Sequence, residues 1–168
     1  MQGRIAQLSI SKGGLPKFAV SEAWAGPLGL EGDVQRNRKY HGGPAKALLL
    51  VSAEDIAELA AAGYPIGPGA LGENLTIEGL DFRRLRAGQR FLAGGAVLEL
   101  TTLRRPCANL DPYNSDPHDP IQKRLYDELC KAGDASSPRW AMGGFYAAVL
   151  QPGLIRMGDI IALADQKA

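Results

Sequence analysis

Cysteine and histidine are scarce in this sequence, which has only two residues of each among 168. Cys107 and Cys130 lie far apart in different settings, unlike the framework of a secreted disulfide protein. A zinc site would have to combine them with His41 and His118, yet no two of these residues have the short spacing of structural zinc sites. A protease-like pair of Cys107 and His118 lacks any local nucleophile signature. These scarcities argue against a disulfide scaffold, a zinc knuckle and a cysteine protease.

An excess of charge is also lacking, since 19 Lys and Arg residues face 18 Asp and Glu residues. No overall field therefore recruits nucleic acid or an anionic membrane, and any anion site must be local. No apolar run approaches the roughly 20 residues of a membrane span, and the first residues lack the apolar core of a signal peptide. We expect a soluble, cytoplasmic protein with no nucleic-acid or membrane partner.

Glycine and proline, by contrast, are abundant, with 21 and 11 residues and no low-complexity repeats. This composition is typical of many short strands joined by tight turns. The length fits a single domain over residues 1–168. Alternating or continuous apolar runs predict strands at residues 4–11, 18–24, 47–51, 75–78, 91–92, 96–100, 145–151, 155–157 and 160–163.

Two helices complete the predicted elements. Ser52 caps one at residues 53–62, and Asp119 with Pro120 opens another that places Ile121, Leu125 and Leu129 on one face. The fold class that follows is mainly β (α+β), a β-barrel-like domain with two or more short helices packed outside it or across one end.

The segment around Cys107 is the first candidate site, because it begins where the predicted strand 96–101 leaves the sheet. Pro106 disfavours helix at Arg105, so the approach to Cys107 should be extended, with Arg105, Cys107 and Asn109 on one face. A guanidinium beside the sulfur favours the thiolate over an isolated thiol, whose pKa is about 8.5. The alternative is that Cys107 is an inert, buried filler.

Two glycine-rich loops are further candidates. Residues 26–43 end in a basic and aromatic cluster at residues 36–41, which either clamps an anion or is a solvated basic loop. Residues 67–74 end in Glu73 and Asn74, at the entrance of a predicted strand. These two side chains either belong to a site or satisfy backbone amides of the turn.

Four collinear stretches together resemble the MOSC family, the C-terminal domain of molybdenum-cofactor sulfurases and its stand-alone relatives. The resemblance covers about residues 26–163. The sequence departs from the family pattern at Leu103, where the family often has proline, and at Gly143, where it often has arginine. The four stretches are Gly32-Asp33 with Arg38-Lys39-Tyr40-His41-Gly42-Gly43 and Lys46-Ala47; Gly69-Ala70-Leu71-Gly72-Glu73-Asn74-Leu75; Arg104-Arg105-Pro106-Cys107; and Gly144-Phe145-Tyr146 with Arg156-Met157-Gly158-Asp159.

The resemblance implies a β-rich domain that binds the molybdenum cofactor, a pterin with a dithiolene and a phosphate. It implies that Cys107 is the catalytic residue and the molybdenum ligand of an oxidoreductase that reduces N-hydroxylated small molecules with electrons from a flavin or iron–sulfur protein. A second implied role is that of a non-catalytic carrier of persulfide sulfur or cofactor. A third alternative is a small β-barrel interaction module whose site has been lost. The implied cofactor-binding residues are Arg38, Lys39, His41, Glu73, Asn74, Arg104, Arg105 and Asn109.

Overall fold

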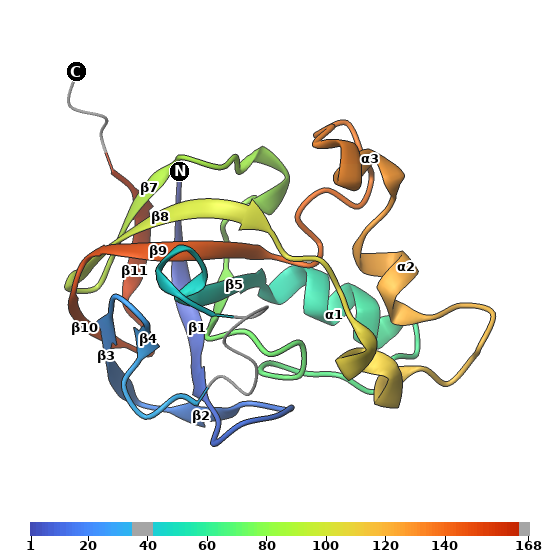
Figure 1. The fold of residues 1–168 in the computed structure, drawn as a ribbon, viewed down its shortest axis with the longest axis horizontal. Coiled ribbons are helices and arrows are strands. Elements are labelled where there is room, and N and C mark those ends of the chain that lie inside the picture. The colour runs from blue at the N-terminus through green and yellow to red at the C-terminus, as the bar shows by residue number, and fades with distance from the viewer. Residues whose placement is uncertain (35–41, 165–168) are drawn as a thin grey trace.

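A closed barrel organises the chain (Figure 1). The computed structural model describes residues 1–34 and 42–164, and within them seven strands close in the order β1-β11-β7-β8-β9-β5-β6 and back to β1. The β5–β6 pair is parallel, and the other pairs of the ring are antiparallel. The ring confirms the predicted barrel-like β fold. Its strands are β1 (Gln2–Ile10), β5 (Leu48–Ser52), β6 (Leu75–Glu78), β7 (Arg90–Ala93), β8 (Ala96–Leu103), β9 (Phe145–Gln151) and β11 (Ile160–Leu163).

A smaller, three-stranded sheet lies beside the barrel, and its presence shows that the predicted strand at residues 18–24 is wrong in its extent. It has the order β10 (Gly153–Arg156), β3 (Glu22–Gly26), β4 (Gly29–Leu30), while β2 (Phe18–Val20) pairs with β1 of the barrel. Residues 18–24 were predicted as one strand, but the chain passes from one sheet to the other at Ser21. The alternating pattern continues through this bend, so the sequence alone does not reveal it.

Three α-helices and three short 3-10 helices lie outside the barrel in the described part of the chain. The second predicted helix is wrong in its extent, because the backbone is extended at Tyr126 and Asp127, and Asp127 caps a separate helix by accepting from the Cys130 amide at 2.8 Å. Leu129 is consequently exposed rather than part of an apolar stripe. The helices are α1 (Ala53–Ala61), α2 (Ile121–Leu125), α3 (Glu128–Ala132), η1 (Pro44–Lys46), η2 (Phe82–Arg84) and η3 (Ala108–Tyr113). None of the described helices has the length and apolar character needed to span a bilayer.

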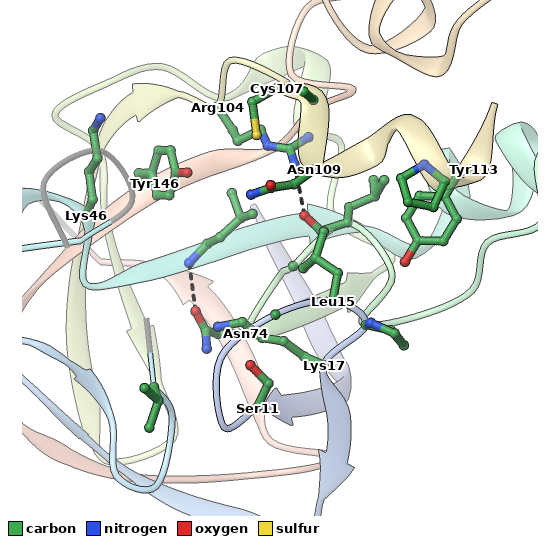
Figure 2. Close-up of a pocket in the computed structure, with 18 residues that line it drawn as sticks. Ser11, Leu15, Lys17, Lys46, Asn74, Arg104, Cys107, Asn109, Tyr113 and Tyr146 are labelled. Atoms are coloured by element: carbon green, nitrogen blue, oxygen red, sulfur yellow. Dashed lines mark hydrogen bonds between the residues drawn. The ribbon is translucent and has the colours of Figure 1, made fainter. Parts of the chain in front are cut away.

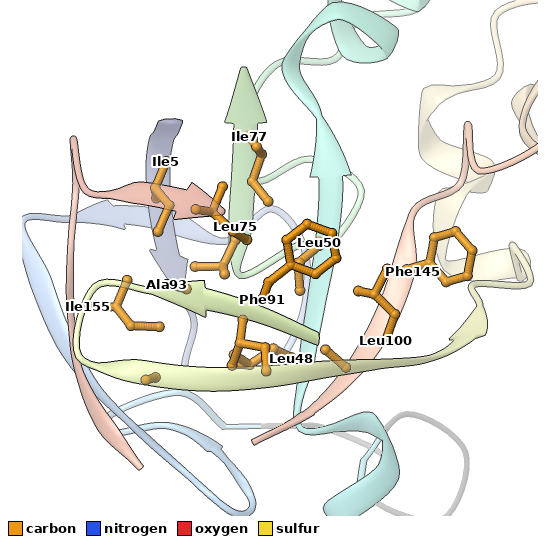
Figure 3. Close-up of a cluster of buried hydrophobic side chains, with 14 of the residues drawn as sticks. Ile5, Leu48, Leu50, Leu75, Ile77, Phe91, Ala93, Leu100, Phe145 and Ile155 are labelled. Atoms are coloured by element: carbon orange, nitrogen blue, oxygen red, sulfur yellow. The ribbon is translucent and has the colours of Figure 1, made fainter. Parts of the chain in front are cut away.

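Strand β5 is buried along its whole length because it serves two apolar clusters. Leu48 and Leu50 point into the barrel, where they pack with side chains such as Phe91 and Phe145 (Figure 3). Their alternating neighbours belong to a second cluster outside the barrel wall. A fully buried strand of this kind reads as a continuous apolar run, as residues 47–51 do.

The second cluster attaches the chain's helical segments to the barrel. Leu49 and Val51 of β5 meet Leu110 of η3 and Ile121 and Leu125 of α2 there. Because η3 follows Cys107 directly, this packing fixes the segment that carries the candidate thiol against the outer face of β5.

The first prediction concerns Asp55 in the first turn of α1, whose side chain lies 3.6 Å from the Arg83 guanidinium. Burial raises the pKa of the Asp55 carboxyl to about 6 from its ordinary 3.8, although Arg83 opposes the shift. The folded state therefore binds this proton more tightly than the unfolded state, so stability from Asp55 is full below about pH 4 and is lost as the pH rises through 6. Asp55→Asn should accordingly gain about 1–3 kcal/mol of unfolding free energy relative to wild type between pH 4 and pH 8. Urea unfolding of both proteins across this range measures the difference, and a difference independent of pH contradicts the prediction.

Candidate functional site

A cavity of about 950 Å³ opens beside the end of β8 and contains the candidate thiol (Figure 2). Its walls come from residues 11–17 between β1 and β2, from Leu49 of β5, from the 67–74 loop, from residues 104–113 and from Tyr146 of β9. These segments are far apart in sequence, so the cavity is a product of the barrel's closure. Its volume is within the range of sites that hold a drug-sized molecule or cofactor.

Cys107 lies at the point where β8 has ended and η3 begins. The Arg104 amide still donates to the Gly144 carbonyl at 2.9 Å, and Pro106, which has no amide proton, then releases the chain from the sheet. The Cys107 carbonyl accepts from the Leu110 amide at 3.1 Å and from Gln122 Nε2 at 3.3 Å. The backbone of this half-buried cysteine is thus held from two sides while its side chain lines the cavity.

Arg104, and not Arg105, is the cation that faces the cavity with Cys107. Arg104 is 4% exposed and its Nη2 donates to the Leu71 carbonyl at 3.0 Å. Arg105 is exposed, and its guanidinium lies 6.0 Å from the centre of the Tyr126 ring. The expectation that Arg105 shares a face with the sulfur is therefore wrong. Side-chain alternation in an extended segment predicted Arg105 as the neighbour of the sulfur, but tertiary packing buries Arg104, the first arginine of the motif, there instead.

Tyr146 and Lys46 complete the wall next to Cys107, and the sequence had assigned neither a role. Figure 2 shows the Tyr146 hydroxyl turned toward Cys107 and Arg104. Burial raises the pKa of the Tyr146 phenol, and the charge of Arg104 opposes this shift. Burial likewise lowers the pKa of Arg104, against the influence of Tyr146 and Cys107. The Lys46 ammonium lies 5.3 Å from the Tyr146 ring centre, a cation–π contact that brings a second cation to the cavity. Both residues lie in stretches that resemble the MOSC family, and this resemblance was the sequence signal that could have identified them as site residues.

Asn74 joins three segments at the opposite wall of the cavity. Its side-chain oxygen accepts from the Leu49 amide at 3.2 Å, and its side-chain nitrogen donates to the Ser9 carbonyl at 3.2 Å and to Asp33 Oδ2 at 2.9 Å. Asp33 is also the ion-pair partner of Lys17, which lines the cavity. The side chain of Asn74 is therefore committed to the framework, although Asn74 does border the cavity as expected of a binding residue.

Glu73 is fully buried and does not line the cavity. Its Oε1 accepts from the Gly69 amide and from Thr76 Oγ1, which is the turn-satisfying role weighed against a site role. Burial raises the pKa of the carboxyl, and the Gly69 amide opposes that shift. Glu73 supports the wall from behind rather than presenting a group to a ligand.

The remaining candidates divide between the cavity, the surface and the residues outside the described ranges. Asn109 is exposed at the rim and lines the cavity. Cys130 is 3% exposed, with its Sγ 3.3 Å from Ser137 Oγ, and takes no part in the cavity. Arg38, Lys39 and His41 lie outside the described residues. Within residues 1–34 and 42–164 no group of three or more His, Cys, Asp and Glu side chains could hold a metal ion by itself.

Gly143, one of the two departures from the family pattern, lies against the site's backbone. A Cβ added there would come within 3.0 Å of the Arg104 carbonyl oxygen. The next glycine is more constrained, since φ is +86° at Gly144 and a Cβ would meet the Leu50 carbonyl oxygen at 2.2 Å. In this chain a larger residue at position 143 would therefore require the Arg104 carbonyl to shift by a few tenths of an ångström.

The second prediction compares two asparagines of the cavity wall. Asn74→Ala leaves the buried Leu49 amide without its side-chain acceptor and removes two further hydrogen bonds, so it should lower the unfolding free energy by about 2–4 kcal/mol. The matched control, Asn109→Ala at an exposed position, should change it by no more than about 0.5 kcal/mol. Chemical denaturation measures both, and equal effects of the two substitutions would refute the framework role of Asn74.

Comparison with known proteins identifies relatives of the chain. YiiM of Escherichia coli (strain K12) is 37% identical over 102 residues, which are 56% of this chain and 44% of YiiM. The uncharacterized protein YflK of Bacillus subtilis (strain 168) is 36% identical over 83 residues, 48% of this chain and 37% of YflK. The matched segments thus span less than half the length of these relatives.

Solved structures share the fold. YiiM from Geobacillus stearothermophilus superposes with a TM-score of 0.69 at 24% identity, covering 98% of this chain and 76% of that one. YUAD of Bacillus subtilis gives 0.69 at 21% identity, covering 96% and 94%. The MOSC domain model matches residues 37–162, which include the Cys107 segment, β5, β6 and β9. The chain belongs to the MOSC domain family.

Proposed function

We propose that this protein binds a molybdenum cofactor in the cavity, with Cys107 as the protein ligand of molybdenum, and that it reduces N-hydroxylated small molecules. The observation that carries the proposal is a half-buried thiol in a cavity of about 950 Å³ whose adjoining wall is cationic. MOSC family membership supports the choice of cofactor, because the family is associated with it.

The residues present fit such a group in charge and in ligand number. A pterin phosphate needs local cations, and Arg104, Lys46 and Lys17 all border the cavity. A thiolate is a soft ligand suited to a soft metal site. The described residues offer no cluster of several metal-binding side chains, so an ion at Cys107 must arrive with its other ligands, as the dithiolene of a pterin provides.

In the proposed reaction the substrate takes up two electrons and two protons and releases water, leaving an N–H in place of N–OH. The cofactor supplies the metal chemistry of oxygen removal when it is bound, with electrons delivered by a flavin or iron–sulfur protein. Arg104 and Tyr146 orient polar groups beside the sulfur, because both lie in the wall next to Cys107. The apolar side chains of Leu15, Leu49 and Leu71 keep water away from part of the cavity surface.

The second candidate is a carrier that holds persulfide sulfur or cofactor on Cys107 for delivery to another enzyme. One observation favours it: Cys107 is only half-buried, and its neighbours Ala108 and Asn109 are exposed, so a second protein has access to this rim. A carrier must release its cargo, whereas a reductase must keep its metal ligand through turnover.

The third prediction separates the two cysteines. Cys107→Ser should lose more than about 90% of bound molybdenum while the protein stays folded, because a hydroxyl is a poorer ligand than a thiolate. Cys130→Ser should keep its molybdenum, because Cys130 is buried beside Ser137 and away from the cavity. Metal analysis of both purified variants, with circular dichroism as the folding control, gives the answer, and equal molybdenum content in the two variants would end the ligand hypothesis.

The fourth prediction separates the reductase from the carrier. Protein loaded with cofactor and given a chemical reductant should reduce a simple amidoxime or hydroxylamine with many turnovers per molybdenum and should carry no cyanide-labile sulfur. Product formation and thiocyanate release are measured on the same preparation, with Cys107→Ser as the control. Absence of turnover together with thiocyanate release proportional to intact Cys107 would establish the carrier instead.

A further inference from the structure

We propose that Glu73 is a positioning residue for the cationic side of the cavity: through the 67–72 loop it determines where the Arg104 guanidinium and the segment bearing Lys17 stand. Glu73 is itself absent from the cavity wall. Its influence on a ligand is therefore indirect, and each link of the connection is a contact between described residues. The proposal rests on the proposed function only in taking the cavity as the ligand site.

The first link joins the carboxylate to the loop. Glu73 Oε1 accepts from the Gly69 amide, four residues earlier, and from Thr76 Oγ1 at 3.0 Å on strand β6. One buried oxygen thus holds the loop to the barrel strand that follows it. Such an acceptor is expensive to remove, because a buried amide left without a partner costs about 1–3 kcal/mol.

The second link runs from the loop to the segment between β1 and β2. The Gly69 carbonyl accepts from the Lys17 amide at 2.9 Å. The approach is so close that a Cβ at Gly69 would meet the Lys17 carbonyl oxygen at 2.2 Å, and φ at Gly69 is +91°. Displacing Gly69 must therefore move the backbone of Lys17, whose side chain is ion-paired with Asp33 at the cavity.

The third link reaches Arg104. The Leu71 carbonyl, in the same loop, accepts from Arg104 Nη2 at 3.0 Å. Within the described ranges the second oxygen of Glu73 and Nη1 of Arg104 are both buried and make no hydrogen bond. Glu73 therefore acts on Arg104 through the loop, whose Gly69 amide it binds and whose Leu71 carbonyl accepts from Arg104.

The positive potential that Arg104 produces beside Cys107 therefore depends on Glu73, which lies behind the cavity wall. If the loop relaxes, Arg104 loses its carbonyl acceptor and keeps its hydrogen bond with Tyr146, so its guanidinium can shift toward water. A charge that moves from a buried site into water loses most of its effect on a neighbouring sulfur.

The experiment uses the 168-residue chain without cofactor and measures the rates at which Cys107 is alkylated by iodoacetate and by iodoacetamide. Both reagents react with the thiolate and release iodide, so the thiolate fraction cancels in the ratio of the two rates, which then reports the local potential alone. Peptide mass spectrometry assigns the modification to Cys107. Because no cofactor is involved, this assay gives its result whether or not the proposed reductase activity is found.

Glu73→Ala should lower the iodoacetate to iodoacetamide ratio about fivefold, because Arg104 no longer stays beside the sulfur. Glu73→Gln keeps an oxygen for Gly69 and Thr76 and should hold the ratio within about twofold of wild type, a rescue by the conservative variant. Asp55→Asn removes another buried carboxylate with an unpartnered oxygen, remote from Cys107, and should leave the ratio unchanged.

Two results would overturn the proposal: a Glu73→Ala ratio within about twofold of wild type, or a Glu73→Gln ratio that falls as far as that of Glu73→Ala. If Glu73→Ala does not fold, Glu73→Asp replaces it, since the shorter side chain keeps the charge but draws the oxygen back from Gly69. That variant should lower the ratio about threefold, and an unchanged ratio in it is equally decisive against the proposal.

Discussion

The burial of β5 on both faces is the constraint on which the rest of the structure depends. One face closes the barrel core and the other supports η3, α2 and the neighbouring loops. No residue of β5 faces solvent. A shift of one residue in its pairing would exchange the side chains that face the two clusters, so its register with the neighbouring strands is fixed. Leu49 pairs with Tyr146 across the β5–β9 ladder and donates its amide to Asn74. Two walls of the cavity are thus placed by the same residue.

Polar groups around the cavity are arranged in two layers. The inner layer, with Cys107, Arg104 and Tyr146, borders the cavity. In the outer layer the carboxylates of Glu73 and Asp33 accept hydrogen bonds from the segments that form the walls, and Asn74 both borders the cavity and binds these segments. Glu73 and Asn74 are 0% and 2% exposed, and hydrogen bonds to neighbouring segments accompany this burial, as they do for most buried polar groups.

Much of the architecture could be predicted from the sequence. The barrel, the 53–62 helix and the 91–100 hairpin followed from apolar periodicity and turn residues, because these signals are local. The break at Ser21 and the division of the second helix at Tyr126 were missed, since each depends on which distant strand or cap competes for the chain.

The site was predictable in part for the same reason. The segment of Cys107 was recognisable from its motif, and Cys107 does line a cavity. Alternation along an extended chain favoured Arg105 as its neighbour, whereas tertiary burial selected Arg104, which finds its acceptor in Leu71, 33 residues away. The bonds of Glu73 to Gly69 and Thr76 are local, and this turn-satisfying role was one of the two expected from the sequence. The bonds of Asn74 to Leu49 and Ser9 join distant segments that no local pattern encodes.

The parallel pairing of β5 with β6 has a consequence for the origin of the cavity. Antiparallel neighbours can be joined by a short turn at one end, but parallel neighbours require the chain to travel back along the barrel before the next strand begins. In this chain the return path is α1 followed by the glycine-rich residues 67–74, and it is this returning segment that forms the wall holding Arg104. A single reversal of strand direction in an otherwise antiparallel ring thus supplies the chain length that forms one wall of the cavity.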